Sequence, residues 1–235
     1  MLEPNKGKTL ERTVAGHTYL RLPIKTKLIT NKDNLSLLLK EYVVPHLEPG
    51  DLIFISEKIV ALVQNRIILI ADVHASAFAR FLSDHVDNHR NTKDFKGFGH
   101  GTPEGMQLFI DEAGYIRVFI AAVVAALTRP LGMKGLFYTI SGTMAKSVDC
   151  PMSWDLEPYT KYAKRAPFHP TQVAQDIKKE FGHDTIIVDA NYIGAFSLGS
   201  SNRAISERFI QEVLRDNPAG QGAEMTPFFI IRKVN

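Results

Sequence analysis

Short apolar runs that end in polar residues recur along this chain. Residues 185–188 form an unbroken run rich in β-branched side chains, which is followed by Asp189 and Asn191. Such a run is typical of a strand covered on both faces, and polar groups at its end emerge where a site can form. The pattern makes Asp189 a candidate functional residue. The alternative is that Asp189 and Asn191 only shape the turn that leads to Gly194, as Asx side chains often do.

Residues 50–58 repeat this design with a turn, an apolar strand over residues 52–55, and then Ser56, Glu57 and Lys58. Apolar residues continue with the spacing of a short helix, so these three polar residues lie at a predicted strand-to-helix junction. Backbone amides at such a junction can face an anion. The plainer interpretation is a helix cap with two solvated charges.

The remaining pattern predicts a mixed α+β fold whose strands carry the site at their ends. Further strands are expected at residues 19–29, 67–70, 136–140 and 228–231. Helices are expected at residues 35–44, 59–63, 76–85, 171–181 and 205–214, with two more within residues 106–127. The apolar residues 118–127 are too few to cross a bilayer, which takes about 20 residues. They are therefore expected to form a buried helix.

The chain is expected to consist of an N-terminal arm at residues 1–17 and a ligand-binding domain at residues 18–235, with residues 97–170 as an inserted lobe or lid. The glycine-rich residues 97–105 would either approach a phosphate closely or act as a flexible connector. The aromatic loop at residues 150–170 is interpreted either as a substrate cover or as a surface packed against a partner subunit. His85 and His89 have metal-like spacing but lack further ligands, and are taken as surface residues.

Composition narrows the function. The chain has 235 residues, of which 45% are hydrophobic and 23% charged, which is typical of a globular domain. Its net charge of +3 is dispersed, which argues against nucleic acid as a partner but allows a small anionic ligand. The single cysteine, Cys150, fits a reducing compartment, and the polar N-terminus lacks a signal-peptide core. A cytoplasmic protein without a membrane partner is expected.

Three segments, taken together, resemble the coenzyme factor 420 gamma-glutamyl ligase family. They are residues 23–35, 50–60 and 170–191, with the order and spacing of that family. Its enzymes add glutamate to a deazaflavin coenzyme with GTP. The resemblance implies the family's α+β fold, a homodimer, and small-molecule partners, namely a nucleotide, glutamate and a coenzyme acceptor.

The resemblance also implies roles for the matching positions. Nucleotide contacts are implied for Thr26, Lys27, Leu28, Ile29, Ser56, Glu57 and Lys58. Asp189 and Asn191 fall on a family segment that holds a divalent metal, magnesium or manganese, and Asp149 is the nearest candidate for a further acidic ligand. Lys58 is the candidate catalytic residue, because a lysine can offset phosphate charge; Lys27 is the alternative.

Four positions depart from the family pattern. Ala190 stands where the family has threonine, Tyr192 and Ile193 replace its Gly-Arg pair, and Leu62 sits where relatives often carry a lysine. These departures keep two alternatives open. One is a non-catalytic nucleotide-binding or assembly module on the same fold, and the other is a glutamate ligase for a different acceptor, such as a folate.

Joining a carboxylate to an amine requires activation, so a ligase of this class first forms an acyl phosphate with GTP or ATP. The protein then mainly neutralises charge and aligns the partners. Oxygen ligands such as Asp189, helped by Asp149 or Glu57, suit magnesium or manganese. This chemistry requires that the polar residues after Val188 lie beside those after Ile55.

Overall fold

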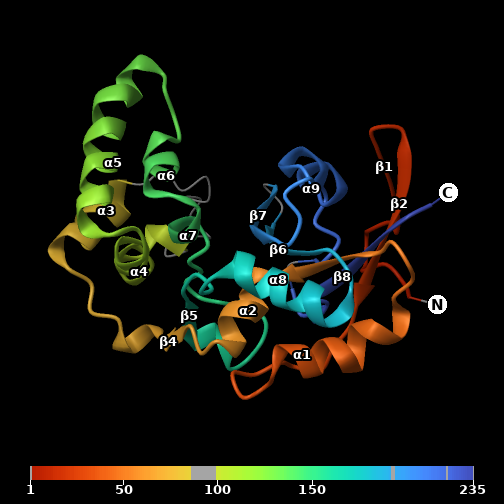
Figure 1. The fold of residues 1–235 in the computed structure, drawn as a ribbon. Helices are drawn as coiled ribbons and strands as arrows, with labels where there is room; N and C mark the ends of the chain where they lie inside the picture. Colours follow the sequence, from red (N-terminus) through yellow and green to blue (C-terminus); the bar gives the residue numbers. More distant parts are fainter. Residues whose placement is uncertain (1, 86–98, 192–193, 221, 235) are drawn as a thin grey trace. The chain divides into compact units, whose positions relative to one another are not determined.

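The computed structural model describes residues 2–85, 99–191, 194–220 and 222–234 (Figure 1). The chain forms two compact units: residues 1–65 with 167–235, and residues 66–166. The second unit starts at residue 66, earlier than residue 97, the start expected from the sequence for an inserted lobe.

Six strands and four helices organise the described part of the first unit. The strands are β1 (Glu11–Val14), β2 (His17–Ile24), β3 (Leu52–Ser56), β6 (Thr185–Ala190), β7 (Ala195–Ser200) and β8 (Phe228–Lys233). The helices are α1 (Leu35–Leu38), which continues as π- and 3-10-helical turns to His46, α2 (Glu57–Val63), α8 (Pro170–Phe181) and α9 (Glu207–Val213). Each strand and helix predicted for this unit is present, but β2 ends at Ile24 instead of residue 29, and the helix expected at residues 35–44 is α-helical only to Leu38. β1 and β7 were not anticipated by the apolar pattern.

The six strands form one mixed sheet in the order β1-β2-β8-β3-β6-β7. β3 and β6 are parallel, whereas the other neighbouring pairs are antiparallel. Because β8 is antiparallel to both of its neighbours, β2 runs in the same direction as β3 and β6. This mixed sheet with its helices confirms the predicted α+β fold.

The N-terminal segment is part of this unit rather than a loose arm, which corrects the expectation for residues 1–17. β1 pairs with β2, and Val14 is buried. The Asn5 side-chain amide donates hydrogen bonds of 2.8 Å to the Pro218 carbonyl and to the Thr226 hydroxyl. The segment is therefore tied to the chain that leads into β8.

Helices cover both faces of the sheet around β6 (Figure 1). Ile210 and Val213 of α9 pack on the face that carries Ile186. α8 lies against the other face, since Gly199, which pairs with Ile187, approaches the start of α8. Residues 185–188 of β6 are consequently buried, as their unbroken apolar run predicts.

Gly199 allows β7 to approach α8 closely. A Cβ at this position would lie 2.3 Å from the Thr171 nitrogen and 2.4 Å from the Pro170 carbonyl carbon. We expect Gly199→Ala to lower the free energy of unfolding by about 1–3 kcal/mol, because backbone atoms would have to move apart. Urea unfolding would measure this. Gly194→Ala, where a Cβ meets nothing within 4 Å, is the control; equal stability of the two variants would contradict the prediction.

The second unit is mainly helical. Its helices are α3 (Ala77–His85), α4 (Pro103–Ala113), α5 (Tyr115–Thr128), α6 (Leu136–Ser141) and α7 (Thr143–Lys146). A small antiparallel ladder joins β4 (Ile67–Leu69) to β5 (Tyr162–Lys164), so part of the expected aromatic loop is a strand. The core contains Leu82, Met106, Phe109 and Val118.

Among the helices that the structure describes, none has the length and apolar composition needed to span a membrane.

Residues 136–140 form helix α6, so the strand predicted there is wrong. A short apolar run does not by itself distinguish a strand from a helix. The rings of Phe137 and Tyr138 both pack on Phe109, with centroids 5.3 Å and 5.8 Å away. A strand would have sent these two adjacent side chains to opposite faces. The shared contact with Phe109 therefore favours the helix.

Three further expectations concern this unit. Helix α5 was expected to be buried, but Val118 and Ala121 are its buried residues and most of its other apolar side chains are exposed. In the glycine-rich stretch, a Cβ at Gly105 would lie 2.1 Å from the Gly99 carbonyl oxygen, so this glycine serves packing. His89 of the histidine pair lies outside the described residues.

Candidate active site

The polar residues that follow β2, β3 and β6 lie at one edge of the first unit's sheet. β3 and β6 are parallel neighbours, with Ser56 opposite Val188 in the register. The chain after Ile55 therefore emerges beside the chain after Val188, as the ligase interpretation requires. β2 ends at the same edge because it runs in the same direction, two strands away from β3.

The register sets the three ends at one level. Phe228 of β8 lies opposite Ile24 on one side and Ile55 on the other, and Ile55 lies opposite Ile187. Ile24, Ile55 and Ile187 thus lie in one row across the sheet. Two residues further along each chain are Thr26, Glu57 and Asp189. Since neighbouring strands are about 4.8 Å apart, Glu57 and Asp189 leave the sheet about one strand spacing apart, and Thr26 about two spacings from Glu57.

The chain that enters β8 fixes both flanking segments. The Thr26 amide donates to the Met225 carbonyl at 2.9 Å, and the Ser56 amide donates to the Pro227 carbonyl at 2.8 Å. The Thr26 hydroxyl donates to the Lys27 carbonyl at 2.8 Å, and its side chain is buried. Through these hydrogen bonds, Thr26 fixes the backbone that follows β2 against the chain that enters β8.

Beyond Thr26, the predicted nucleotide-binding segment forms a loop in which Lys27 and Leu28 are exposed. Lys27 Nζ donates to Asp33 Oδ1 at 2.6 Å, and this hydrogen bond raises the pKa of Lys27 and lowers the pKa of Asp33. Asp33 Oδ2 also accepts from the Thr30 amide at 2.7 Å. Leu28 is partly exposed, whereas Ile29 is buried in the core. To bind a phosphate, Lys27 would have to break its ion pair with Asp33.

The triplet at the end of β3 differs from a simple helix cap. Ser56 occupies the N-cap position of α2, but its side chain makes no capping hydrogen bond. Glu57 is only 2% exposed, so the interpretation as two solvated charges is wrong for this residue. A carboxylate is costly to bury unless it is paired. Lys58, which follows it, is half-buried.

At the end of β6 the two candidate metal ligands have different surroundings. Asp189 is half-buried and pairs with Phe196 of β7. The Asn191 amide donates to the Gly194 carbonyl at 2.9 Å, and Asn191 Oδ1 accepts from the Gly194 amide at 3.3 Å. Asn191 therefore shapes the turn, as the plainer interpretation holds, whereas Asp189 precedes the turn and lies within β6. Tyr192 and Ile193 lie outside the described residues.

Asp149 belongs to the second unit. Its backbone exchanges hydrogen bonds of 3.0 Å and 2.8 Å with Lys164, and its carboxylate lies 3.6 Å from Lys164 Nζ. The Lys164 side chain is fully buried. A buried ammonium needs an opposite charge, so this pairing gives Asp149 a structural role in its own unit. Its assignment as a metal ligand stays a prediction.

The donor set at the sheet edge suits a magnesium-type ion. Within the described ranges, no group of three or more His, Cys, Asp or Glu residues could hold a metal ion. Magnesium usually binds through one or two carboxylates together with substrate phosphates and waters, rather than in an all-protein cage. Glu57, at the start of α2 directly after β3, and Asp189, near the end of the adjacent parallel strand β6, match that requirement. They would hold the ion by carboxylate oxygens.

Two of the four departures from the family pattern have a packing explanation. Leu62 is 1% exposed within α2, so it belongs to the core and contributes no polar group to the site. Ala190 packs against the core under α9. Alanine there keeps the end of β6 apolar on that face, whereas Asp189 faces the other way.

The fold and the grouped polar residues place the chain in the class of α+β proteins with a candidate small-molecule site at the carboxyl ends of parallel strands. The sequence profile of the F420-0:Gamma-glutamyl ligase family matches residues 23–227. The match covers most of the chain, and the protein belongs to this family. Comparison with curated proteins gives no match.

The apolar pattern did not reveal two features of this site. The carbonyls of Met225 and Pro227 hold the backbone of both predicted nucleotide-binding segments, and Asp33 neutralises Lys27. The sequence predicts the strand at residues 228–231 itself. Nothing local in the sequence indicated that this strand lies between β2 and β3.

Proposed function

We propose that the protein is a nucleotide- and metal-dependent gamma-glutamyl ligase that adds L-glutamate to F420-0 or to a related coenzyme acceptor through an acyl phosphate. The observation that supports this most is the parallel pairing of β3 and β6, in which Ser56 lies opposite Val188. The chain that continues to Glu57 and Lys58 therefore leaves the sheet beside the chain that continues to Asp189. The family membership supplies the reaction class. GTP or ATP is the proposed phosphate donor.

The proposed mechanism assigns a task to each group. Lys58 binds the transferred phosphate and offsets its negative charge as an acceptor carboxylate oxygen attacks the γ-phosphorus of the nucleotide. The bond to the β-phosphate oxygen breaks, the nucleoside diphosphate leaves, and the acyl phosphate forms. Asp189, with Glu57, holds magnesium or manganese, which when bound would neutralise phosphate charge. The loop from Thr26 to Ile29 lies along the nucleotide. The glutamate amine then attacks the acyl carbon, phosphate leaves, and the amide bond forms.

The family resemblance also supports a homodimer, and the single buried cysteine supports a cytoplasmic location. Both are part of the proposal.

Product analysis tests the proposed reaction. The purified protein is incubated with GTP or ATP, manganese, L-glutamate and either F420-0 or a folate, and phosphate release and product mass are followed. We expect phosphate release that requires both glutamate and the acceptor, and a product heavier by one glutamyl residue. Nucleotide binding without phosphate release on any acceptor would favour a non-catalytic module instead.

Lys58→Ala tests the assigned phosphate contact. We expect a fall in kcat/KM for the nucleotide of roughly 10–100-fold, because hydrogen bonds to charged groups contribute about 1.5–3 kcal/mol. Lys58→Arg should recover part of the loss. Lys179→Ala, which removes an exposed lysine on α8, should leave kcat/KM unchanged. An unaffected Lys58→Ala enzyme would exclude Lys58 from phosphate binding.

A further inference from the structure

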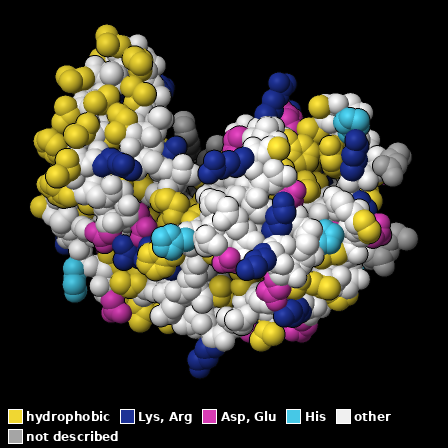
Figure 2. Space-filling view, viewed as in Figure 1, with side chains coloured by type: hydrophobic (Ala, Val, Ile, Leu, Met, Phe, Trp, Pro, Cys, Tyr) yellow, Lys and Arg dark blue, Asp and Glu magenta, His cyan; other side chains and the backbone are white. Residues whose placement is uncertain are grey.

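Helix α5 exposes an apolar face in the second unit. Its exposed large side chains, with those just after the helix, are Tyr115, Ile116, Phe119, Ile120, Val123, Leu127, Leu131 and Met133. Ile116, Leu127 and Leu131 are 75%, 70% and 76% exposed. The other face of α5 packs into the unit's own core through Val118 and Ala121. Figure 2 shows hydrophobic side chains gathered over this helix.

This face, called the α5 patch, is large for a surface that stays in water. With roughly 150–250 Å² for a large ring and somewhat less for an aliphatic side chain, eight residues exposed by about half to three-quarters present on the order of 800 Å². The largest apolar patch of a typical monomer covers about 300–600 Å². A standard protein interface buries about 800 Å² per partner. The patch therefore has the size of one side of a stable interface.

The spacing along the patch fits another helix. Ile116, Ile120, Val123 and Leu127 follow one another at intervals of four, three and four residues. This is the spacing of an a/d seam, in which each side chain inserts between residues of a facing helix. A bilayer places no such requirement on spacing. A helix that lies on a membrane also has a polar opposite face, whereas the opposite face of α5 is core.

We propose that the α5 patch is a self-association surface, on which α5 of a second copy packs antiparallel about a two-fold axis between Ile120 and Val123. A two-fold interface uses the same surface on both copies, so one apolar seam can complete the other. A parallel pairing would place Arg129 and Lys134 of both copies side by side. An antiparallel pairing separates these like charges and aligns opposite ends of the two helix dipoles.

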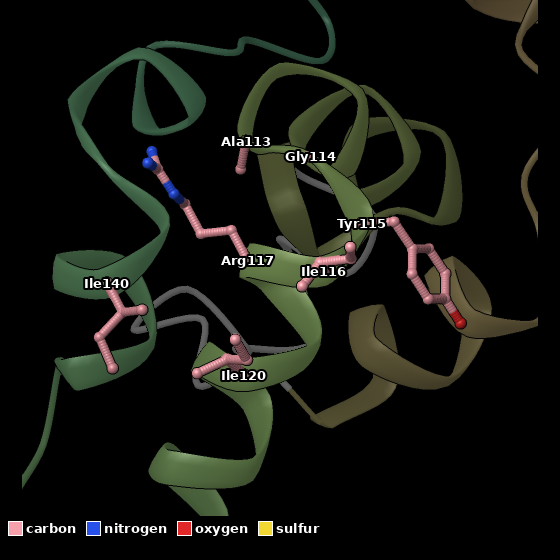
Figure 3. A pocket seen from close by; sticks show the side chains of 7 residues that line it. All are labelled: Ala113, Gly114, Tyr115, Ile116, Arg117, Ile120 and Ile140. Atoms are coloured by element: carbon pink, nitrogen blue, oxygen red, sulfur yellow. The ribbon is translucent and has the colours of Figure 1, made fainter.

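A pocket next to the seam supports this direction. It has a volume of about 680 Å³ and is lined by Ile116, Ile120 and Ile140, among others. Figure 3 shows these side chains around it, with Tyr115 turned away. Antiparallel pairing brings Leu127 of the second copy opposite Ile116, at the mouth of this pocket. The protruding leucine of one copy then meets a hollow of the other.

The inference deepens the proposed homodimer but does not depend on ligase activity. Sedimentation equilibrium of the full chain between about 1 and 100 μM would measure the oligomeric state. We expect a dimer, and a loss of dimerisation affinity of at least 100-fold for the double variant Ile116→Glu/Leu127→Glu. Circular dichroism should show that this variant remains folded, because both side chains are largely exposed. Leu37→Glu, which changes a 63% exposed leucine in the first unit, should stay dimeric.

Disulfide trapping tests the direction of pairing. We expect Ile116→Cys and Leu127→Cys to cross-link when mixed and oxidised. Neither should cross-link alone, since equivalent positions would lie about 16 Å apart along the helices at 1.5 Å per residue, too far for a disulfide. The native Cys150 is buried, and burial raises the pKa of its thiol to about 11. The unmodified protein is therefore the unreactive control.

Several outcomes would overturn the inference. They are a monomeric wild-type protein at 100 μM, a dimer unaffected by the double glutamate variant, and cross-linking of each single cysteine variant with itself. Residues 115–148 carry four basic and no acidic residues, so co-sedimentation with phosphatidylserine vesicles is measured in parallel. If the protein is a monomer that binds these vesicles, and salt weakens this binding, the α5 patch is a membrane-binding surface and not a dimer interface. Phosphate release, assayed separately, reports on the ligase proposal alone.

Discussion

Replacing Asp189 by asparagine is expected to reduce phosphate release at least roughly 100-fold, since even partners outside the first metal shell typically cost about 10–100-fold in affinity or activity. Asparagine keeps the shape of the side chain but removes the negative charge that would hold the ion. The residue is half-buried at the end of β6, so the sheet should tolerate the change. Raising the manganese concentration should recover part of the activity.

The experiment separates a catalytic from a structural aspartate. Phosphate release and the thermal unfolding temperature are measured on the same preparations. Asp176→Asn, which neutralises an exposed aspartate on α8, serves as the control. A loss of activity with an unchanged unfolding temperature supports the metal role. Unfolding of the Asp189→Asn protein, or full activity of a folded one, would contradict it.

The second large effect is expected on stability, at Arg21 in β2. Its side chain is fully buried and pairs with Asp216, whose side chain is 35% exposed. Arg21 also donates hydrogen bonds to the Thr9 carbonyl at 2.6 Å and the Val213 carbonyl at 3.2 Å. Removing one partner of a buried pair typically costs about 3–5 kcal/mol. Because water partly screens Asp216, we expect Asp216→Ala to lower the free energy of unfolding by about 2–3 kcal/mol.

The same pair predicts a pH dependence. Burial opposes ionisation of Asp216, but the hydrogen bonds and charge of Arg21 outweigh this effect, so the pKa of Asp216 lies below its ordinary value of 3.8. A carboxylate with a lowered pKa stabilises the fold above its unfolded pKa, and this contribution is lost as the pH falls through its folded pKa. The stability difference between wild type and Asp216→Ala should therefore be full at pH 6 and should shrink below about pH 4.

Urea unfolding at several pH values between 3 and 7 checks both expectations. Asp176→Ala provides the matched exposed control and should change stability little at any pH. A difference between wild type and Asp216→Ala that stays constant down to pH 3 would show that Asp216 acts through packing rather than through its charge.

Local sequence was sufficient for the elements that carry the candidate site. The runs before Asp189 and Ser56 are apolar and flanked by turn residues, so burial on both sides of the sheet follows from composition alone. The helix at residues 171–181 likewise follows from its periodicity and from Gly182, which ends it in the left-handed conformation. Such signals are local because each depends on a few neighbouring residues.

Residues 118–127 and 136–140 were the points where local sequence failed. Both are short and apolar, and apolar character alone does not say what will cover a side chain. Ile116 and Val118 are similar residues two positions apart, yet one is 75% exposed and the other fully buried. Only the packing of α5 on the unit's core decides between them.

The sequence by itself determined the α+β class, the apolar strands and the polar residues at their ends, because these depend on chain stiffness and on the periodicity of burial. Only the tertiary structure decided that β8 lies between β2 and β3, that Glu57 is buried beside the end of β6, and that Asp149 belongs to the other unit. Strand order and register arise from contacts between residues far apart in the chain, and no local pattern encodes them.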